Sequence, residues 1–236
     1  MNPVFLDVET SGFADDDKIV ELALKARGSM PQVAHSLYNP ERPIGHEAMA
    51  VTHITNKMVA DAPLFLGSPL HTTLNNLLAK DHVLVAHNAD FDMKFLKREG
   101  IEINGPHICT YKVAYHQDEQ ALLPKHTLQF LRYHFFEEEE FEGENIVAHS
   151  AASDVLVLER LFKHLEKSYT IEEMIEISSK PMLIKKFSFG KYKGEWIKDV
   201  ARKDTNYLIW MRREMANMEE SLRYTINYWI EHRRDI

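Results

Sequence analysis

The sequence predicts an α/β fold in which a mixed sheet is flanked by helices, followed by a smaller C-terminal module. Apolar runs near the N-terminus have strand character, and residues 83–86 form a short continuous apolar run typical of a buried strand. Beyond these runs, leucines recur at helical spacing. With 236 residues, 44% of them hydrophobic, the chain can bury a full core.

The first part of the chain predicts an antiparallel meander. Residues 3–8, 18–26 and 33–38 each combine apolar and β-branched side chains over strand length. Pro40 and Pro43 then end regular structure, because proline cannot donate to a strand ladder.

Helices are expected around and after the buried strand. Thr55 is a plausible N-cap for a short helix, and residues 68–80 carry leucines at helical spacing. The strand at 83–86 leads into a helix that begins within 87–92. Further helices are expected at 111–115, around 128–131, from a start within 149–154 and, with a capping box, after Thr170.

The segment Ser178-Ser179-Lys180-Pro181 predicts a domain boundary, which divides the chain into domains at 1–178 and 179–236. Residues 187–194 have hairpin character, and helices are expected around 207–215 and 222–230. From Lys180 to the end there are 13 Lys/Arg against 8 Asp/Glu, so this module is basic while the rest of the chain is acidic. An acidic body with a basic module suits a metal-dependent enzyme that acts on a polyanion.

Composition excludes several classes of protein. The net charge of −8 argues against a protein that coats DNA through bulk electrostatics. No apolar run approaches transmembrane length, no secretory signal precedes the first strand, and the single Cys109 cannot form an internal disulfide. We therefore expect a cytoplasmic protein without a membrane partner.

Asp7 and Glu9 are the first candidate site residues. Alternation along a strand puts both carboxylates on one face, roughly 7 Å apart. Burial of such a pair costs hydration and brings like charges together, and a divalent cation removes both problems. The alternative is a strand end whose acids face water.

Five groups at the ends of predicted elements complete the candidate site: Asp7, Glu9, Asp92, His149 and Asp154. Four carboxylates and one imidazole are what a two-metal phosphodiester hydrolase needs, with the imidazole accepting a proton from water. His149 and Asp154 would lie about 140° apart on a regular helix, so they share a cleft only if His149 precedes the helix. Taken singly, each acid could be a first-turn helix acid and His149 a surface histidine.

The motifs Asp-x-Glu-Thr, His-Asn-x-x-Phe-Asp and His-x4-Asp resemble the three exonuclease motifs of the DnaQ-like (DEDDh) superfamily, over roughly residues 4–165. The resemblance implies a ribonuclease-H-like fold. It also implies that Asp92, which follows the phenylalanine, is the acid of the second motif rather than Asp90. The implied roles are metal binding for Asp7, Glu9, Asp92 and Asp154, and general base for His149.

The resemblance extends to a bacterial exodeoxyribonuclease group within that superfamily, through residues 39–44, 48–55, 58–61 and the C-terminal segments 187–194, 199–201 and 207–210. It implies a 3′→5′ exonuclease that acts on DNA 3′ ends, in single strands and duplexes, with a role in DNA repair. The implied cofactor is Mg²⁺, two ions per site, with Mn²⁺ able to substitute. The acidic run 137–142 belongs to no motif and is expected to be a solvated loop.

Substrate contacts are expected by analogy. Met49 and Ile54 would form a wedge under the terminal bases, although both could instead be core residues. The other expected contacts are His53 near the wedge, Thr10 at the 3′ hydroxyl, and Asn88 with Phe91 lining the pocket. In the C-terminal module, Phe189, Lys191, Tyr192 and Lys193 could follow a nucleic-acid strand or belong to a hairpin that packs.

Three alternatives to a DNA exonuclease stay open. The same motifs serve an RNA-trimming exonuclease and a polymerase proofreading subunit. A non-catalytic module that binds nucleic acid or a protein partner is the third, and the five filled catalytic positions argue against it.

Overall fold

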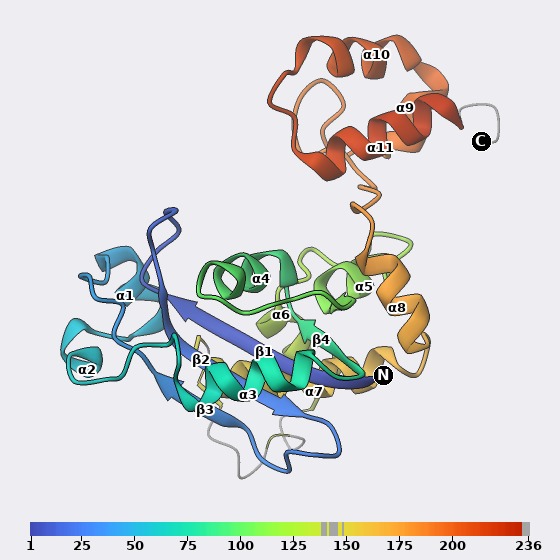
Figure 1. The fold of residues 1–236 in the computed structure, drawn as a ribbon. Helices are drawn as coiled ribbons and strands as arrows, with labels where there is room; N and C mark the ends of the chain where they lie inside the picture. Colours follow the sequence, from blue (N-terminus) through green and yellow to red (C-terminus); the bar gives the residue numbers. More distant parts are fainter. Residues whose placement is uncertain (138–140, 142–145, 148, 233–236) are drawn as a thin grey trace. The chain divides into compact units, whose positions relative to one another are not determined.

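The computed structural model describes residues 1–137, 141, 146–147 and 149–232 (Figure 1). Chain contacts divide it into two compact units. The first comprises residues 1–115 and 125–179, and the second comprises residues 116–124 and 180–236. Separate domains at 1–178 and 179–236 stay a prediction.

The first unit is built on a mixed sheet, which confirms the predicted fold class. Within the described residues the strand order is β3-β2-β1-β4-β5. The pairs β1–β2 and β2–β3 are antiparallel, as expected of the meander, and β1–β4 and β4–β5 are parallel. The strands are β1 Asn2–Thr10, β2 Ile19–Ala26, β3 Ala34–Leu37, β4 His82–Ala86 and β5 His107–Cys109.

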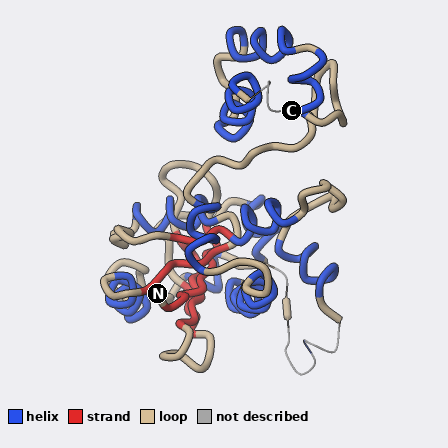
Figure 2. Tube along the Cα trace, turned by 90° about the vertical axis from the view of Figure 1, so that its right-hand side faces the viewer, coloured by secondary structure: helices blue, strands red, loops and turns tan. Residues whose placement is uncertain are grey.

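Helices cover both faces of this sheet (Figure 2). Val4, Leu6 and Val8 pack into a core with side chains of α3 (Pro69–Leu78) and α4 (Ala89–Arg98). On the opposite face, Phe5 meets Phe162 of α7 (Ala151–Leu165), with ring centroids 5.2 Å apart. Because side chains alternate along β1, Asp7 and Glu9 lie on the α7 face.

Smaller helices complete the unit. Thr55 caps α2 (Asn56–Val59) as expected, since its hydroxyl accepts from Met58 N at 3.4 Å. The predicted capping box of Thr170 and Glu173 opens α8. The remaining helices are α1 His46–Thr52, α5 Thr110–Gln117, α6 Leu128–Phe135 and α8 Ile171–Ser178.

The second unit has its own core, to which α9 (Ile197–Lys203), α10 (Thr205–Glu214) and α11 (Glu220–Glu231) contribute. The helices expected around 207–215 and 222–230 correspond to α10 and α11. Helix α9 was not predicted. It has only seven residues, which is too short for apolar side chains to show a clear helical periodicity. The hairpin expected at 187–194 is present as a short antiparallel pairing: Lys186 bridges Trp196, and Phe187 N donates to Glu195 O at 3.0 Å.

Most of the acidic run 137–142 lies outside the described residues. Among its described members, Phe141 is buried. Across the described part of the chain, no helix combines the length and apolarity that a membrane span requires.

Candidate active site

Parallel pairing brings two chain segments to one edge of the sheet. Because β1 and β4 run in the same direction, the end of β1 with Glu9 meets the turn that follows β4. Asn88, in the left-handed conformation with φ 67°, turns the chain from β4 into α4. Asp92 in the first turn of α4 then accepts a hydrogen bond from Val8 N at 3.2 Å. This backbone contact ties Asp92 to the strand that carries Asp7 and Glu9.

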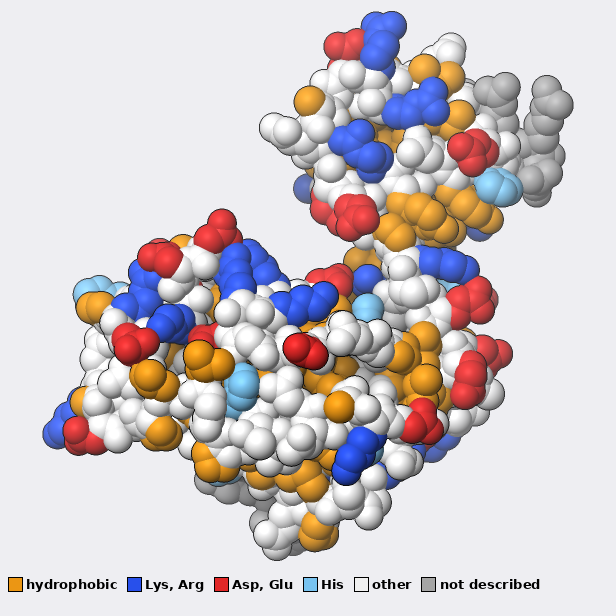
Figure 3. All heavy atoms as spheres, viewed as in Figure 1, with side chains coloured by type: hydrophobic (Ala, Val, Ile, Leu, Met, Phe, Trp, Pro, Cys, Tyr) orange, Lys and Arg blue, Asp and Glu red, His pale blue; other side chains and the backbone are white. Residues whose placement is uncertain are grey.

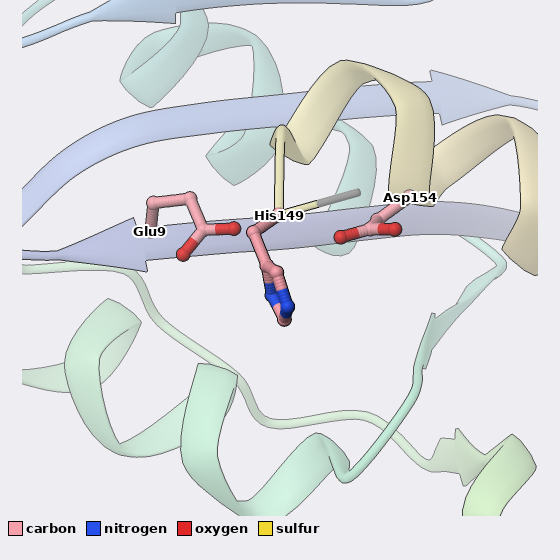
Figure 4. Close-up of side chains that lie close together, drawn as sticks. All are labelled: Glu9, His149 and Asp154. Atoms are coloured by element: carbon pink, nitrogen blue, oxygen red, sulfur yellow. The ribbon is translucent and has the colours of Figure 1, made fainter. Parts of the chain in front are cut away.

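Helix α7 supplies the remaining two groups. Asp154 lies in its first turn, and His149 precedes it at φ 59°, which confirms the expectation that the histidine comes before the helix. Glu9, His149 and Asp154 offer ligand atoms that all lie within 4.8 Å of one another (Figure 4). The half-buried Glu9, the buried Asp154 and the exposed imidazole of His149 converge, although Glu9 is far from the other two in the sequence.

Gln129 of α6 orients Asp154. Its Nε2 donates to Asp154 Oδ1 at 2.5 Å, and Arg132 Nη1 in turn donates to Gln129 Oε1 at 3.4 Å. Sequence reasoning missed Gln129, because a single glutamine in an amphipathic helix carries no signal of a partner 25 residues away.

The electrostatics of the site are those of crowded, buried acids. Burial and then the charges of Asp154, Glu21 and Asp92 raise the pKa of Glu9 to about 8. Burial raises the pKa of Asp92 to about 8 and that of Asp154 to about 6, against the lowering effect of their hydrogen bonds from Val8 and Gln129. Burial, followed by the charge of Asp92, raises the pKa of Asp7 well above its ordinary value.

This donor set fits divalent cations. Carboxylate oxygens are the ligands that Mg²⁺ and Mn²⁺ prefer, and a bound cation reverses the repulsion that raises the acids' pKa values. Asp7, Glu9, Asp92 and Asp154 are the residues that could hold such ions, and His149 lies with Glu9 and Asp154 in a group whose ligand atoms are within 4.8 Å of one another.

Glu21 of β2 is a further acid of the site that sequence reasoning missed. It pairs with Glu9 across β1 and β2, and its side chain is buried. One oxygen accepts from Ala151 N at 3.1 Å and the other lies 3.4 Å from His35 Nδ1. Glu21 therefore anchors the first turn of α7, from which Asp154 projects. An acid within the apolar run of β2 is the signal that could have revealed it.

The residues expected at the 3′ end lie next to the acids. Thr10 is buried at the end of β1, and its hydroxyl donates to Gly12 O at 2.8 Å. Asn88 is exposed, and the partly buried Phe91 lies with its ring centroid 6.0 Å from that of Phe13. Phe13 is 72% exposed, an apolar ring on the surface next to the site that sequence reasoning did not consider.

The residues expected at and near the wedge differ in burial. Ile54 is 4% exposed and packs in a cluster with Val20, which agrees with the alternative that it is a core residue. Met49 is partly buried against that cluster. His53 is exposed at the end of α1. Gly45 N donates to Ser11 O at 3.2 Å, which ties the start of α1 to the turn after β1. Contact of Met49, His53 and Ile54 with bases stays a prediction.

His87 of the second motif has a structural role. Its ring nitrogens lie 2.9 Å from Thr110 Oγ1 and 2.8 Å from His126 O. Burial lowers its pKa to about 4, so the neutral ring links β4 to two later segments.

The sequence matches family models in both units. Residues 4–162 match the family described as Exonuclease, which covers all five candidate catalytic residues. Residues 187–214 match the family described as Exodeoxyribonuclease X-like C-terminal.

Similarity to individual proteins covers nearly the whole chain. Exodeoxyribonuclease 10 of Escherichia coli strain K12 is 30% identical over 234 residues, which covers 96% of this chain and 98% of that protein. A DNA polymerase III subunit epsilon-like protein of Rhodobacter capsulatus is 39% identical over 108 residues but is covered over only 15% of its length.

Among solved structures, Exonuclease X in complex with 5′ overhanging duplex DNA aligns with a TM-score of 0.57 and 27% identity, covering 75% of this chain and 99% of that one. Escherichia coli Exonuclease I with a dT13 oligonucleotide shares the fold, with a TM-score of 0.54 and 14% identity, over 74% of this chain and 42% of that one. The chain belongs to the exonuclease family of the DnaQ-like superfamily, as a homologue of exodeoxyribonuclease 10.

Proposed function

We propose that this protein is a metal-dependent 3′→5′ exonuclease that hydrolyses DNA from the ends of single strands and duplexes. One observation carries the proposal: in an exonuclease-family chain, Glu9, His149 and Asp154 offer ligand atoms that lie within 4.8 Å of one another. The other two acids are close by, since Asp92 accepts from Val8 N, and burial and then the charges of the neighbouring acids raise the pKa of Asp7. The names of its relatives, exodeoxyribonuclease 10 and an Exonuclease X bound to duplex DNA, support DNA as the substrate.

Each residue has a part in the proposed hydrolysis. Two divalent cations held by Asp7, Glu9, Asp92 and Asp154 would neutralise the scissile phosphate and stabilise the attacking and leaving oxygens. His149 accepts the proton of the attacking water, and its exposure lets that proton pass to solvent. The hydrogen bonds from Val8 N and Gln129 Nε2 hold Asp92 and Asp154 in place. Mg²⁺ is the proposed ion, with Mn²⁺ as a substitute.

Binding of the terminal nucleotide must not depend on the base. The exposed ring of Phe13 beside Phe91 offers a stacking surface that any base can use. Asn88 lies in the same turn region, and Thr10 ends the strand that carries the acids. In this proposal Met49 and His53 extend the contact surface, while Ile54 supports it from the core.

An RNA-trimming exonuclease or a proofreading subunit would use the same acids. The C-terminal match at residues 187–214 and the coverage of 98% of exodeoxyribonuclease 10 favour the DNA exonuclease. The DNA polymerase III subunit epsilon-like relative, by contrast, is matched over only 15% of its length. A role in DNA repair and a cytoplasmic location remain predictions.

Digestion of 5′-labelled oligonucleotides tests the proposal. DNA and RNA of one sequence, and DNA that is single-stranded, blunt or 3′-recessed, are incubated with Mg²⁺ or with chelator. We expect a ladder shortened from the 3′ end on DNA, dependent on Mg²⁺ and lost in Asp7→Ala. Preference for RNA would replace the proposal by the trimming alternative, and cleavage unaffected by chelator would remove the metal mechanism.

A further inference from the structure

The second unit carries a pair of stacked aromatic rings on its surface. Tyr207 and Trp210 of α10 are three residues apart, so they share a helix face, with ring centroids 5.7 Å apart and planes at 28°. Leu208 and Met211 of the same helix are fully buried in the unit core. Trp210 is 50% exposed, so the core does not account for this ring.

The turn at 187–194 adds a second exposed ring. Phe187 anchors this turn in the core and lies 5.9 Å from Tyr207, measured between ring centroids. Gly190, at φ 74°, passes so close to Tyr207 that an added Cβ would lie 2.7 Å from its hydroxyl. Phe189 precedes this glycine and is 41% exposed. We call Phe189, Tyr207 and Trp210 the aromatic platform.

Cationic side chains accompany the platform. Lys191 Nζ lies 6.0 Å from the ring centroid of Tyr207, and its side chain is 62% exposed although it also pairs with Asp204. Arg213 follows Trp210 by three residues on α10, and its side chain is 80% exposed although it also pairs with Glu214. Figure 3 shows Lys and Arg side chains beside hydrophobic ones on the visible face of this unit.

The packing alternative explains only part of this surface. Tyr192 and Tyr207 are partly buried against the unit core, and Tyr192 donates to Asp204 Oδ2 at 2.6 Å, so these rings have structural roles. Phe189 and Trp210 remain exposed, and each is followed by a cationic residue, Lys191 two positions later and Arg213 three positions later. A ligand that combines flat apolar groups with repeated negative charge matches them, and single-stranded nucleic acid has this chemistry.

We propose that the aromatic platform is a second binding site for single-stranded DNA, separate from the catalytic acids. Bases stack on Trp210 and Phe189, and phosphates pair with Lys191 and Arg213, without readout of sequence. The proposal rests on the proposed function, because its ligand is the substrate strand of that exonuclease. A strand that reaches both units gains affinity through effective concentration, whereas a very short strand occupies one site at a time.

The test measures the affinity of labelled dT30 and dT4 by fluorescence anisotropy in chelator, where no hydrolysis occurs. The full chain is compared with Phe189→Ala/Trp210→Ala and with Leu122→Ala, which removes a 74% exposed apolar side chain elsewhere in the second unit. We expect the double variant to bind dT30 at least about 10-fold more weakly, because both exposed rings on which bases can stack are removed. Leu122→Ala should match the parent.

Short and duplex ligands distinguish binding at the platform from binding and cleavage at the catalytic site. Cleavage of dT4 by the double variant with Mg²⁺ should equal that of the parent, and affinity for a blunt 30-base-pair duplex should be unchanged, because paired bases cannot stack on the rings. Unchanged affinity for dT30, or an equal loss on the duplex, would overturn the proposal.

Trp210→Phe provides a variant that keeps an aromatic ring. The chain has three tryptophans, and stacked bases should quench Trp210. We expect Trp210→Phe to bind dT30 with nearly parental affinity while most of the quenching disappears; undiminished quenching would contradict the platform. If the parent cleaves no DNA yet shows this quenching, the proposed function fails and the platform stands.

Discussion

Two regions are proposed to bind DNA, and they differ in their physical character. One is the candidate catalytic edge, the edge of the sheet in the first unit where the acids and His149 lie, and the other is the aromatic platform of the second unit. At the edge, buried carboxylates with raised pKa values are held by backbone and side-chain hydrogen bonds. On the platform, exposed rings and cations are carried by helix α10 and by the turn at 187–194. Buried, mutually repelling charges make each member indispensable, whereas exposed stacking contacts act additively. Single substitutions should therefore be severe at the edge and moderate on the platform.

The largest effect is expected from Asp92→Asn. The variant keeps the shape of the side chain but removes one metal-binding charge, and a loss of several kcal/mol corresponds to about 1,000-fold in rate or more. Asp90→Asn is the matched control, because Asp90 lies in the same helix turn but is 64% exposed and pairs with Lys112. Steady-state cleavage of labelled single-stranded DNA is the measurement. Equal rates for the two variants would contradict the assignment of Asp92.

His149→Ala comes next. Loss of a general base should lower the turnover number by about 100- to 10,000-fold, with little change in the affinity for DNA. The exposed His46 provides the control substitution His46→Ala. Single-turnover kinetics together with binding in chelator separate the two quantities. Full turnover in His149→Ala near neutral pH would remove this residue as the base.

Comparison of Glu21→Ala with Glu21→Gln distinguishes the effect of the hydrogen bond made by Glu21 from the effect of its charge. Alanine leaves Ala151 N without its acceptor, which costs about 1–3 kcal/mol of unfolding free energy and loosens the first turn of α7. Glutamine can still accept from Ala151 N, so it should restore most of the activity while shifting the Mg²⁺ dependence. Denaturant unfolding and Mg²⁺ titrations of activity provide the measurements. Identical behaviour of both variants would mean that the hydrogen bond has no role in positioning α7.

The stability of the metal-free protein should depend on pH because of the same acids. Glu9 and Asp92, with pKa values raised to about 8, keep their protons in the folded state when the unfolded chain has lost them. Their contribution to stability is therefore present below the unfolded pKa values of 4.5 and 3.8, and is lost as the pH rises through about 8. The unfolding temperature in chelator should fall between about pH 5 and about pH 8.

Mg²⁺ should raise that temperature more at the upper end of this range, because it binds the ionised carboxylates. Asp92→Asn should weaken both the pH dependence and the Mg²⁺ effect, and Asp90→Asn should leave them unchanged. A pH dependence that is identical in all three proteins would assign it to groups outside the site.

The smallest effect belongs to the platform. The substitutions Phe189→Ala and Trp210→Ala should leave the turnover of short substrates unchanged and should weaken the binding of long single strands. An effect on dT4 as large as on dT30 would erase the distinction between the two regions.

Local pattern was sufficient to predict the elements that position the acids. Asp7 and Glu9 lie in an alternating strand, and Asp92 and Asp154 lie in first turns of helices whose apolar spacing is regular. Which residues surround these acids depends on register and packing across the chain. Glu21 reaches the site through its pairing with Glu9, and Gln129 through the packing of α6 on α7. These neighbours could not be predicted, because no local pattern encodes a contact between distant segments.

The burial of individual side chains was the second feature that the sequence did not predict. Ile54 and Phe13 are both apolar residues in irregular surroundings, yet one is buried in a cluster and the other is 72% exposed. From the sequence, Ile54 was expected either in a wedge under the bases or in the core, and Phe13 was not considered. Only the tertiary packing of α1 and α2 against β2 distinguishes a core residue from a surface ring.

Calorimetric titration of Mn²⁺ into the metal-free protein tests the central claim most directly, because it asks whether the converging acids form a cation site without any assumption about substrate. We predict saturable binding to the parent and to Asp90→Asn, and its loss or strong weakening in Asp92→Asn. Absence of saturable binding to the parent, or equal binding to all three proteins, would contradict the account.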